Sequence, residues 1–381
     1  MRYAIVTETY PPEVNGVALT VQGLEQGLRA RGHEVELIRP RQRDDEPSPH
    51  TLLVRGARLP LYAGLKFGLP AARRLRKHWQ RHAPDAIYVA TEGPLGWSAL
   101  SAARRLGIPA ATGFHTRFDH YLRDYGLRWL EPVAIRWMRR FHNRAQATLV
   151  PTRELAGELQ AAGFDHVQRL ARAVDTRQFA PRHRDPSLRA QWNLGDGDLA
   201  VIHVGRIAAE KNLPLAVTAF RALQCRRPDA RMVWIGDGPL RAELAAAHPD
   251  FIFCGMRRGE DLARHVASGD LFLFPSHSET FGNVTLEAMA SGVPTIAFDY
   301  GAAREHLRDG VHGAAVASDG AFIDAALALA CEDARRGRMG IAACAAMRHL
   351  QPEQVAADFD ALLQRLAHAE GSHDHATLAA V

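Results

Sequence analysis

Short runs of consecutive apolar residues alternate with longer segments of helical periodicity along most of this chain. In the first half, these runs predict strands at residues 3–7, 34–38, 86–89, 110–113 and 147–150, with helices such as 17–31 and 94–106 between them. Strands that are apolar at every position are typical of parallel sheets, because helices cover both faces. The first half therefore predicts a parallel α/β domain.

The same pattern restarts in the second half of the chain. It predicts strands at residues 199–204, 232–235, 251–253, 271–274 and 295–298, so a second parallel α/β domain follows the first. Residues 175–197 carry prolines and charges with weaker periodicity, and we expect a hinge there. We place the two domains at residues 1–178 and 190–350, and we expect a final helix at about residues 352–367 to pack back on the first.

Polar and glycine-containing loops follow several of the predicted strands. They are residues 8–16, His115, Arg206 with Lys211, residues 236–238, and Glu279. Because ligands bind at the carboxyl ends of the strands in open parallel sheets, we expect all of these loops to face one cleft between the two domains.

Two carboxylates separated by seven residues, Glu279 and Glu287, lie on either side of a glycine-containing loop and the start of an apolar helix. Asn283 is the expected N-cap of that helix. The backbone N–H groups of Gly282, Asn283 and Val284 would then bind a diphosphate at the positive end of the helix dipole. Glu279 could accept hydrogen bonds from a hexose, and Glu287 from both hydroxyls of a ribose. Alternatively, Glu287 is only a favourable first-turn charge and Glu279 an ordinary loop carboxylate.

Arg206 and Lys211 place two cations on a loop between a buried strand and a helix. Cations in that position would neutralise the charge that develops on a departing nucleoside diphosphate. The alternative is a surface arginine and a Glu210–Lys211 neighbour pair that bind no ligand.

Three further features are weaker on their own. Gly16 ends the first loop at the start of a long helix, so backbone can approach a ligand there, although Pro-Pro followed by Asn-Gly is also common turn chemistry. The turn at Gly236 lacks the third glycine of a dinucleotide fingerprint, and we interpret it as lining a nucleotide pocket. His115 could donate to a sugar hydroxyl, or it could be a structural histidine.

Composition limits the class of protein. At 381 residues the chain is long enough for two domains, and 47% hydrophobic with 23% charged residues are ordinary globular values. Four cysteines without C-x-x-C spacing argue against a disulfide framework and a zinc site, so we expect a reducing cytoplasm. No signal-peptide pattern and no apolar run of about 18 residues occurs, so we expect neither secretion nor a membrane span.

The formal net charge of +5 is distributed unevenly, because no acidic residue lies between Glu46 and Asp85. Residues 59–81 and 131–144 combine apolar residues with cations, and both stretches could lie on an anionic bilayer. The alternative for each stretch is a helix that faces the core and exposes a basic face to solvent. Binding to nucleic acid is disfavoured, because no recognisable nucleic-acid-binding module accompanies the charge. The residues expected at a membrane or acceptor are Lys66, Phe67, Arg73, Arg74 and Lys77, and in the second stretch Trp137, Met138 and Phe141 lie near Arg136, Arg139 and Arg140.

Together these motifs resemble the retaining GT-B glycosyltransferases, and they cover nearly the whole chain. The E-x7-E motif of that family appears as Glu279 to Glu287, G-R-x4-K as Gly205, Arg206 and Lys211, P-P-x3-G as Pro11, Pro12 and Gly16, and H-T as His115 and Thr116. The resemblance implies that Arg206 and Lys211 bind the diphosphate, Glu287 the ribose, and Glu279 and His115 the hexose. It implies catalytic roles for His115, Glu279, Arg206 and Lys211, and a donor site of Gly16, Arg206, Lys211, Gly236, Met256, Glu279, Phe281, Gly282, Asn283, Val284 and Glu287.

Residues 7–16, 114–119 and 174–179 are similar to GDP-mannose-dependent α-mannosyltransferases and related diacylglycerol and sulfolipid glycosyltransferases. Ala173 departs from the glycine usual in those relatives, which affects how that loop approaches an acceptor. The resemblance implies transfer of mannose or glucose from GDP-mannose or a UDP-sugar to a lipid or glycan acceptor at the inner membrane face. It implies a metal-independent reaction with retained anomeric configuration, in which the leaving phosphate deprotonates the acceptor, although Asp119 stays open as a nucleophile.

Two other classes of function remain open from the sequence. A nucleotide-sugar epimerase or a phosphorylase can be built on the same two-domain plan, and a non-catalytic protein that binds sugar nucleotides is the third possibility. Incubation with a panel of UDP- and GDP-sugars separates these classes.

Overall fold

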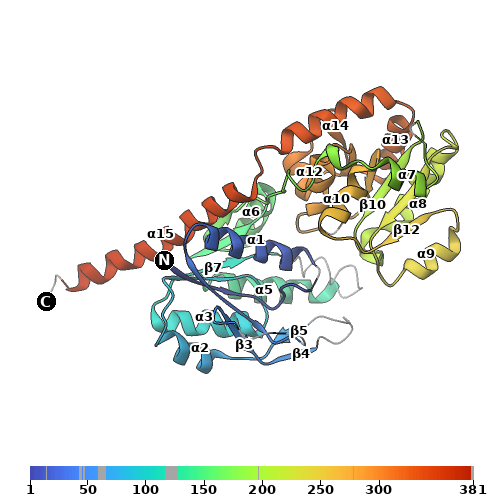
Figure 1. The fold of residues 1–381 in the computed structure, drawn as a ribbon. Coiled ribbons are helices and arrows are strands. Elements are labelled where there is room, and N and C mark those ends of the chain that lie inside the picture. Colours follow the sequence, from blue (N-terminus) through green and yellow to red (C-terminus); the bar gives the residue numbers. More distant parts are fainter. Residues whose placement is uncertain are drawn as a thin grey trace. The chain divides into compact units, whose positions relative to one another are not determined.

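The computed structural model describes residues 1–378 except Val14, 43–44, 46–47, 59–65, 116–127, Asp196 and Ser278. The chain divides into two compact units (Figure 1). The first contains Met1–Ala171 together with Pro352–Val381, and the second contains Arg172–Gln351.

A seven-stranded parallel sheet forms the centre of the first unit, with strand order β3-β2-β1-β6-β7-β8-β9. The strands are β1 (Arg2–Val6), β2 (Glu34–Pro40), β3 (Thr51–Val54), β6 (Ala86–Val89), β7 (Ala110–Gly113), β8 (Ala147–Val150) and β9 (Val167–Arg169). A separate antiparallel pair consists of β4 (Gly56–Arg58) and β5 (Lys66–Gly68). The helices are α1 (Gly16–Ala30), α2 (Ala72–Trp79), α3 (Pro94–Leu106), η1 (Arg128–Leu130), α5 (Glu131–His142), α6 (Arg153–Ala161) and α15 (Pro352–Leu378).

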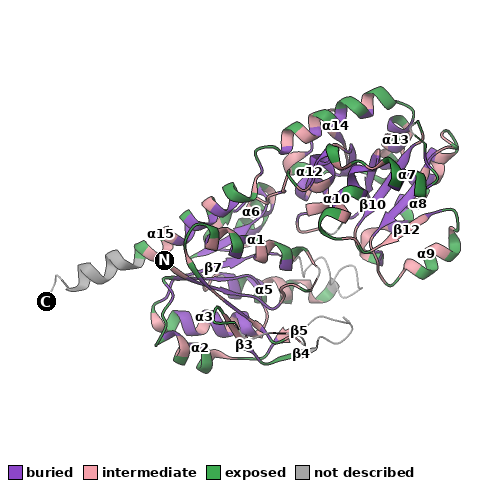
Figure 2. Cartoon of the chain, in the orientation of Figure 1, coloured by how far each residue is buried: buried purple, intermediate pink, exposed green. Residues whose placement is uncertain are grey.

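Successive side chains along each strand point to opposite faces of this sheet. Ala4 and Val6 of β1 pack with Leu75 and Trp79 of α2, while Tyr3 of the same strand donates its hydroxyl to Asp360 of α15 at 3.2 Å. The central strands are therefore buried on both sides (Figure 2).

Helix α15 is fixed to the first unit through Asp360, which is 1% exposed. The carboxylate also accepts a hydrogen bond from Arg31 Nε at 2.8 Å and lies 2.9 Å from His33 Nε2. Burial by itself would raise the pKa of Asp360, but the hydrogen bonds from Arg31 and His33 outweigh it and hold that pKa below its usual value. Backbone contact is close as well, because a Cβ on Gly27 of α1 would lie 2.4 Å from Cβ of Ala356.

A six-stranded parallel sheet forms the second unit, with order β12-β11-β10-β13-β14-β15. The strands are β10 (Ala200–Val204), β11 (Arg231–Ile235), β12 (Ile252–Gly255), β13 (Leu271–Phe274), β14 (Thr295–Phe298) and β15 (Gly313–Val316). The helices are η2 (Pro181–His183), α7 (Pro186–Gln191), η3 (Ala209–Lys211), α8 (Leu213–Gln224), α9 (Arg241–Ala247), α10 (Gly259–Ala267), α11 (Asn283–Ala290), α12 (Gly301–His306), α13 (Asp319–Ala330) and α14 (Asp333–Met347).

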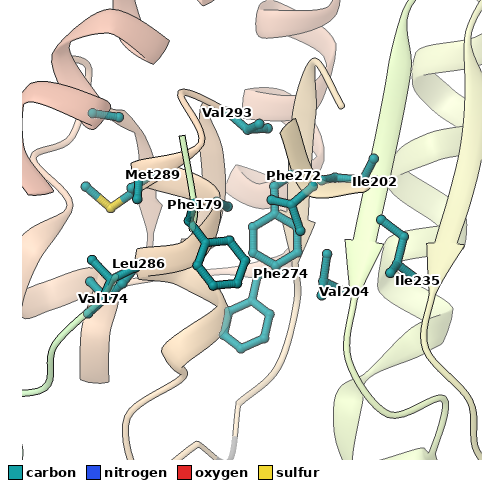
Figure 3. Close-up of a cluster of buried hydrophobic side chains, with 14 of the residues drawn as sticks. Val174, Phe179, Ile202, Val204, Ile235, Phe272, Phe274, Leu286, Met289 and Val293 are labelled. Carbon is teal, nitrogen blue, oxygen red and sulfur yellow. The ribbon is translucent and has the colours of Figure 1, made fainter. Parts of the chain in front are cut away.

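Two apolar clusters cover the faces of this second sheet. One contains Ile202, Phe272 and Leu286 (Figure 3), and the other contains Val201 and Trp234. Because successive residues of β10 fall into different clusters, the strands of this sheet need apolar residues on both faces, which is why they are nearly continuous apolar runs in the sequence.

The prediction of two parallel α/β domains is confirmed. The expected hinge at residues 175–197 is instead folded against the second unit. Phe179 (Figure 3), Leu188 and Trp192 from this stretch are buried in the same cluster as Ile202 and Phe272. Asp185 caps helix α7 by accepting from the N–H of Ser187 at 2.8 Å. Prolines in this stretch therefore start short helices rather than mark an open linker.

Candidate functional site

Lys211 and Glu279 meet in the second unit. Lys211 ends η3 in the loop after β10, and Glu279 lies in the loop after β13. These two strands are neighbours in a parallel sheet, so their following loops leave the same edge. Lys211 Nζ donates to Glu279 Oε1, and the two side chains are 20% and 17% exposed. The structure thus forms an ion pair between Lys211, which the sequence predicts to bind the diphosphate, and Glu279, which it predicts to bind the hexose.

Two hydroxyl groups that the sequence interpretation missed hold Glu279. Ser276 Oγ donates to Glu279 Oε1 at 3.1 Å. The Tyr300 hydroxyl accepts from the backbone N–H of Glu279 at 3.2 Å and donates to the carbonyl of Ser276 at 2.6 Å. Both residues lie just after strands of this sheet, β13 and β14, and that position is the signal that could have identified them.

The N-cap of α11 is Gly282, and the prediction that Asn283 caps this helix is wrong. Gly282 has φ of 89°, a left-handed conformation that a glycine adopts without strain, and a Cβ there would lie 3.1 Å from the ring of Phe274. Asn283 is the first helical residue. Among the described residues, none accepts a hydrogen bond from the backbone N–H groups of Gly282, Asn283 or Val284, as is usual in the first turn of a helix.

Glu287 follows on the same helix, one turn from its start. Its side chain is partly exposed, and burial of the carboxyl group raises its pKa to about 7. No described residue forms a hydrogen bond or ion pair with this carboxylate. An ionised carboxylate without donors in a poorly solvated position is unfavourable, so a ligand that donates to Glu287 would relieve that cost.

The remaining predicted donor residues line the same sheet edge. Arg206 is 46% exposed and donates to Glu210 at 3.1 Å, so the neighbour pair in this loop is Arg206–Glu210 rather than Glu210–Lys211. Gly236 has φ of 149°, and a Cβ there would overlap the carbonyl oxygen of Gly205 at 1.9 Å. Met256 is 49% exposed, and the buried Phe281 accepts at its carbonyl from the N–H of Ala302 at 2.7 Å.

His115 and Gly16 lie in the first unit. His115 is 9% exposed and its Nε2 lies 2.7 Å from the hydroxyl of Tyr88. Gly16 starts helix α1, which Asn15 caps by accepting from the N–H of Ala18 at 2.8 Å. Thr116 and Asp119 lie outside the described residues.

A buried polar group near the carboxyl ends of β1 and β6 was also missed. Glu8 accepts from the backbone N–H groups of Gly68 and Leu95, and burial raises its pKa to about 7. Glu92 lies 3.3 Å from Nε2 of His142, and both are almost fully buried. The position of both glutamates just after a strand was again the available signal.

The two basic stretches differ in what they expose. Arg73, Arg74 and Lys77 of α2 are exposed while Leu75 and Trp79 are buried, so α2 is a core-facing helix with a basic outer face. Phe67 is partly exposed, and the side chain of Lys66 lies outside the described part of the chain.

Three apolar side chains at four-residue spacing are exposed along η1 and α5: Trp129 at 74%, Val133 at 51% and Trp137 at 41%. We name these three residues the α5 stripe. The expectation that Met138 and Phe141 share this surface is wrong, because both are buried in the core, 1% and 0% exposed. Exposed arginines adjoin the stripe at positions 136, 139 and 140.

Among the described residues, no group of three His, Cys, Asp or Glu side chains is arranged to hold a metal ion. No helix in the described part of the chain has the length and apolarity to cross a membrane. The four cysteines are free thiols.

Comparison with known proteins gives two family matches. Residues 14–178 match the model described as Glycosyltransferase Family 4, and residues 198–332 match the one described as Glycosyl transferases group 1. The chain is 36% identical over 312 residues to a GDP-mannose-dependent alpha-mannosyltransferase of Mycobacterium tuberculosis, covering 80% of this chain and 81% of that protein.

A second relative from Mycobacterium tuberculosis is a GDP-mannose-dependent alpha-(1-6)-phosphatidylinositol dimannoside mannosyltransferase. It is 31% identical over 310 residues, which cover 78% of this chain and 79% of that protein. Among solved structures, sucrose-phosphate synthase from Thermosynechococcus elongatus superposes with a TM-score of 0.80 at 19% identity, covering 97% of this chain and 99% of that one.

Proposed function

The chain belongs to glycosyltransferase family 4, and we propose that it transfers mannose from GDP-mannose to a lipid acceptor with retention of the anomeric configuration. The sequence left mannose and glucose, and GDP and UDP, open. Both relatives described above are named as GDP-mannose-dependent, which favours GDP-mannose. The name of one of them also includes a phosphatidylinositol lipid, which favours a lipid acceptor.

The observation that carries this proposal is the arrangement of charge in the second unit. Lys211 and the N-terminus of α11 offer positive charge and backbone N–H groups, which suit a diphosphate. Glu287 is the fifth residue of that helix, about 6 Å along its axis from the first residue. A carboxylate at that spacing suits the ribose of the same nucleotide, and the absence of a hydrogen-bond donor to it among the described residues supports that role.

In the proposed reaction, the bond between C1 of mannose and the β-phosphate oxygen breaks while the acceptor oxygen bonds to C1 on the same face. The proton of the acceptor hydroxyl passes to the departing phosphate, and GDP leaves. Arg206 and Lys211 stabilise the negative charge on GDP, and Glu279 orients the hexose through its hydroxyls.

The α5 stripe supports an acceptor in a membrane surface. Tryptophan side chains are favourable at the boundary between headgroups and acyl chains, and adjacent arginines attract anionic lipids. We therefore propose that η1 and α5 lie on an anionic bilayer, with the stripe inserted and the three arginines at the headgroups.

A donor panel tests the proposed activity. The protein is incubated with radiolabelled GDP-mannose, GDP-glucose, UDP-glucose or UDP-galactose and with vesicles of phosphatidylglycerol that contain diacylglycerol or phosphatidylinositol. The expected result is label in the lipid fraction from GDP-mannose only, and Lys211→Ala is the control that should abolish it. Free epimerised donor, or sugar phosphate formed from added phosphate, would assign the chain to the alternative enzyme classes. Donor binding without any turnover would indicate a non-catalytic protein.

Two further measurements address the finer parts of the proposal. The anomeric configuration of the product, read by NMR, should be α, and a β product would contradict retention. The fraction of protein that sediments with phosphatidylglycerol vesicles should fall when Trp129 and Trp137 are replaced by serine. Ile341 is 75% exposed on α14, a helix without aromatic residues, so Ile341→Ser is the control for the loss of an exposed apolar side chain. An equal fall in the control variant, or no fall in the tryptophan variant, would contradict the proposal that η1 and α5 bind the bilayer.

A further inference from the structure

The loop that carries Glu279 is held by the loop that follows the neighbouring strand. Strands β13 and β14 pair in parallel, with Phe274 opposite Ala297, so the segments after them leave the same edge of the sheet. The Tyr300 hydroxyl bridges this loop by accepting from the N–H of Glu279 at 3.2 Å and donating to the carbonyl of Ser276 at 2.6 Å. A single phenol thereby fixes the backbone on both sides of the loop.

A second contact holds the far end of the same loop. The N–H of Ala302 donates to the carbonyl of Phe281 at 2.7 Å. This close approach depends on Gly301, because its φ is 58° and a Cβ there would lie 2.8 Å from that carbonyl oxygen. Residues 300–302, which we name the 300–302 turn, therefore fasten the Glu279 loop at both ends.

The carboxylate of Glu279 is oriented as well as its backbone. Ser276 is fully buried, and its Oγ donates to Glu279 Oε1 at 3.1 Å, the same oxygen that Lys211 contacts. No described residue bonds to Oε2. With Oε1 engaged by two donors, Oε2 is the oxygen that can accept from a ligand.

We propose that Tyr300 and Ser276 are positioning residues for the transferred hexose: they hold Glu279 so that Oε2 meets the hexose hydroxyls of the donor. This proposal rests on the function proposed above for Glu279. Neither hydroxyl is among the groups that we propose to bind the diphosphate or the ribose. Their loss should therefore impair use of the whole donor, GDP-mannose, while leaving the affinity for GDP unchanged.

The test compares Tyr300→Phe and Ser276→Ala with the wild-type protein. Each substitution removes one hydroxyl and keeps the rest of the side chain that packs. We expect kcat/KM for GDP-mannose to fall about tenfold in each variant, because a misplaced Glu279 should cost the transition state about one hydrogen bond to the hexose. The dissociation constant of GDP, measured by calorimetry, should stay within about twofold of wild type. Tyr3→Phe, which removes a buried hydroxyl bond in the first unit, is the control and should lower only thermal stability.

Combination with Glu279→Gln gives a readout that a purely structural role would not produce. If both hydroxyls act through the Glu279 carboxylate, their removal should cause little further loss of kcat/KM in the Glu279→Gln background, so the effects are non-additive. Full additivity, a parallel loss of GDP affinity, or unchanged kcat/KM in Tyr300→Phe would each overturn the proposal. If the wild-type protein neither binds GDP nor transfers hexose, the proposed function fails instead, and that outcome is seen before any variant is made.

Discussion

The affinity of this protein for GDP should depend on pH through Glu287. Burial raises the pKa of this carboxyl group to about 7, so it changes charge within the physiological range. The ionised form accepts a hydrogen bond from one ribose hydroxyl on each of its oxygens, whereas protonation turns one of these oxygens into a donor. Protonation therefore competes with nucleotide binding, and affinity should rise as pH increases.

The size of the effect follows from linkage. For a pKa of about 7, the apparent dissociation constant is multiplied by 1 + 10^(7 − pH) if only the ionised form binds, which is about 11 at pH 6 and about 1.1 at pH 8. Affinity should thus weaken about tenfold from pH 8 to pH 6, equivalent to about 1.4 kcal/mol.

Isothermal titration calorimetry with GDP at pH 6, 7 and 8 and constant ionic strength measures this dependence. A phosphate monoester also titrates near pH 6, as the terminal phosphate of GDP should, so the decisive quantity is the difference between wild type and Glu287→Gln. Glutamine has no charge to lose, and this variant should keep only the part of the pH dependence that belongs to the phosphate. Identical pH profiles for the two proteins would refute the assignment of the ribose to Glu287.

Two other predictions concern stability and the ion pair of the donor site. Gly27→Ala should destabilise the protein by about 1–3 kcal/mol, because the new Cβ would overlap Ala356 of α15. Gly23 lies one turn earlier, and a Cβ there meets nothing within 4 Å, so Gly23→Ala should stabilise α1 by about 0.5–1 kcal/mol. Thermal melts check both, and equal shifts of the two variants would contradict the packing of α1 on α15. Glu279→Gln should tighten GDP binding about two- to fivefold, because a neutral side chain at position 279 no longer offsets the positive charge of Lys211, while hexose transfer falls. Weaker GDP binding in this variant would show that Glu279 serves the nucleotide itself.

The strands were predictable because both sheets are parallel and buried on both faces. Residues 86–89, 110–113, 271–274 and 295–298 are strands with the predicted bounds, since their runs of apolar residues have no competing helical period. Strand β15, Gly313–Val316, was not predicted, because Gly-Ala-Ala-Val is short and only weakly apolar. Its pairing with β14 supplies the stabilisation that its own sequence does not indicate.

The loops carried less information than the strands. Order along the chain indicated that Lys211 and Glu279 lie at the same sheet edge, but their direct pairing depends on side-chain direction, which spacing does not reveal. The cap at Gly282 could not be distinguished from one at Asn283, because both residue types occur at that position and the choice depends on a left-handed φ.

Polar residues whose contacts join distant parts of the chain were the hardest to find from the sequence. The contact of Tyr300 with Glu279 joins positions 21 apart in sequence through adjacent strands, so no local motif includes both. The same holds for Glu8, whose partners Gly68 and Leu95 lie on two other elements. The roles assigned to the site residues from sequence stay predictions, which the binding and turnover measurements address.

A crystal structure of the protein soaked with GDP-mannose tests directly whether Glu287, Lys211 and the start of α11 bind the nucleotide. We expect both ribose hydroxyls within about 3 Å of the Glu287 carboxylate, and the diphosphate at the N–H groups of Gly282 to Val284 and at Lys211. A nucleotide bound away from α11, or a ribose that does not reach Glu287, would contradict this expectation.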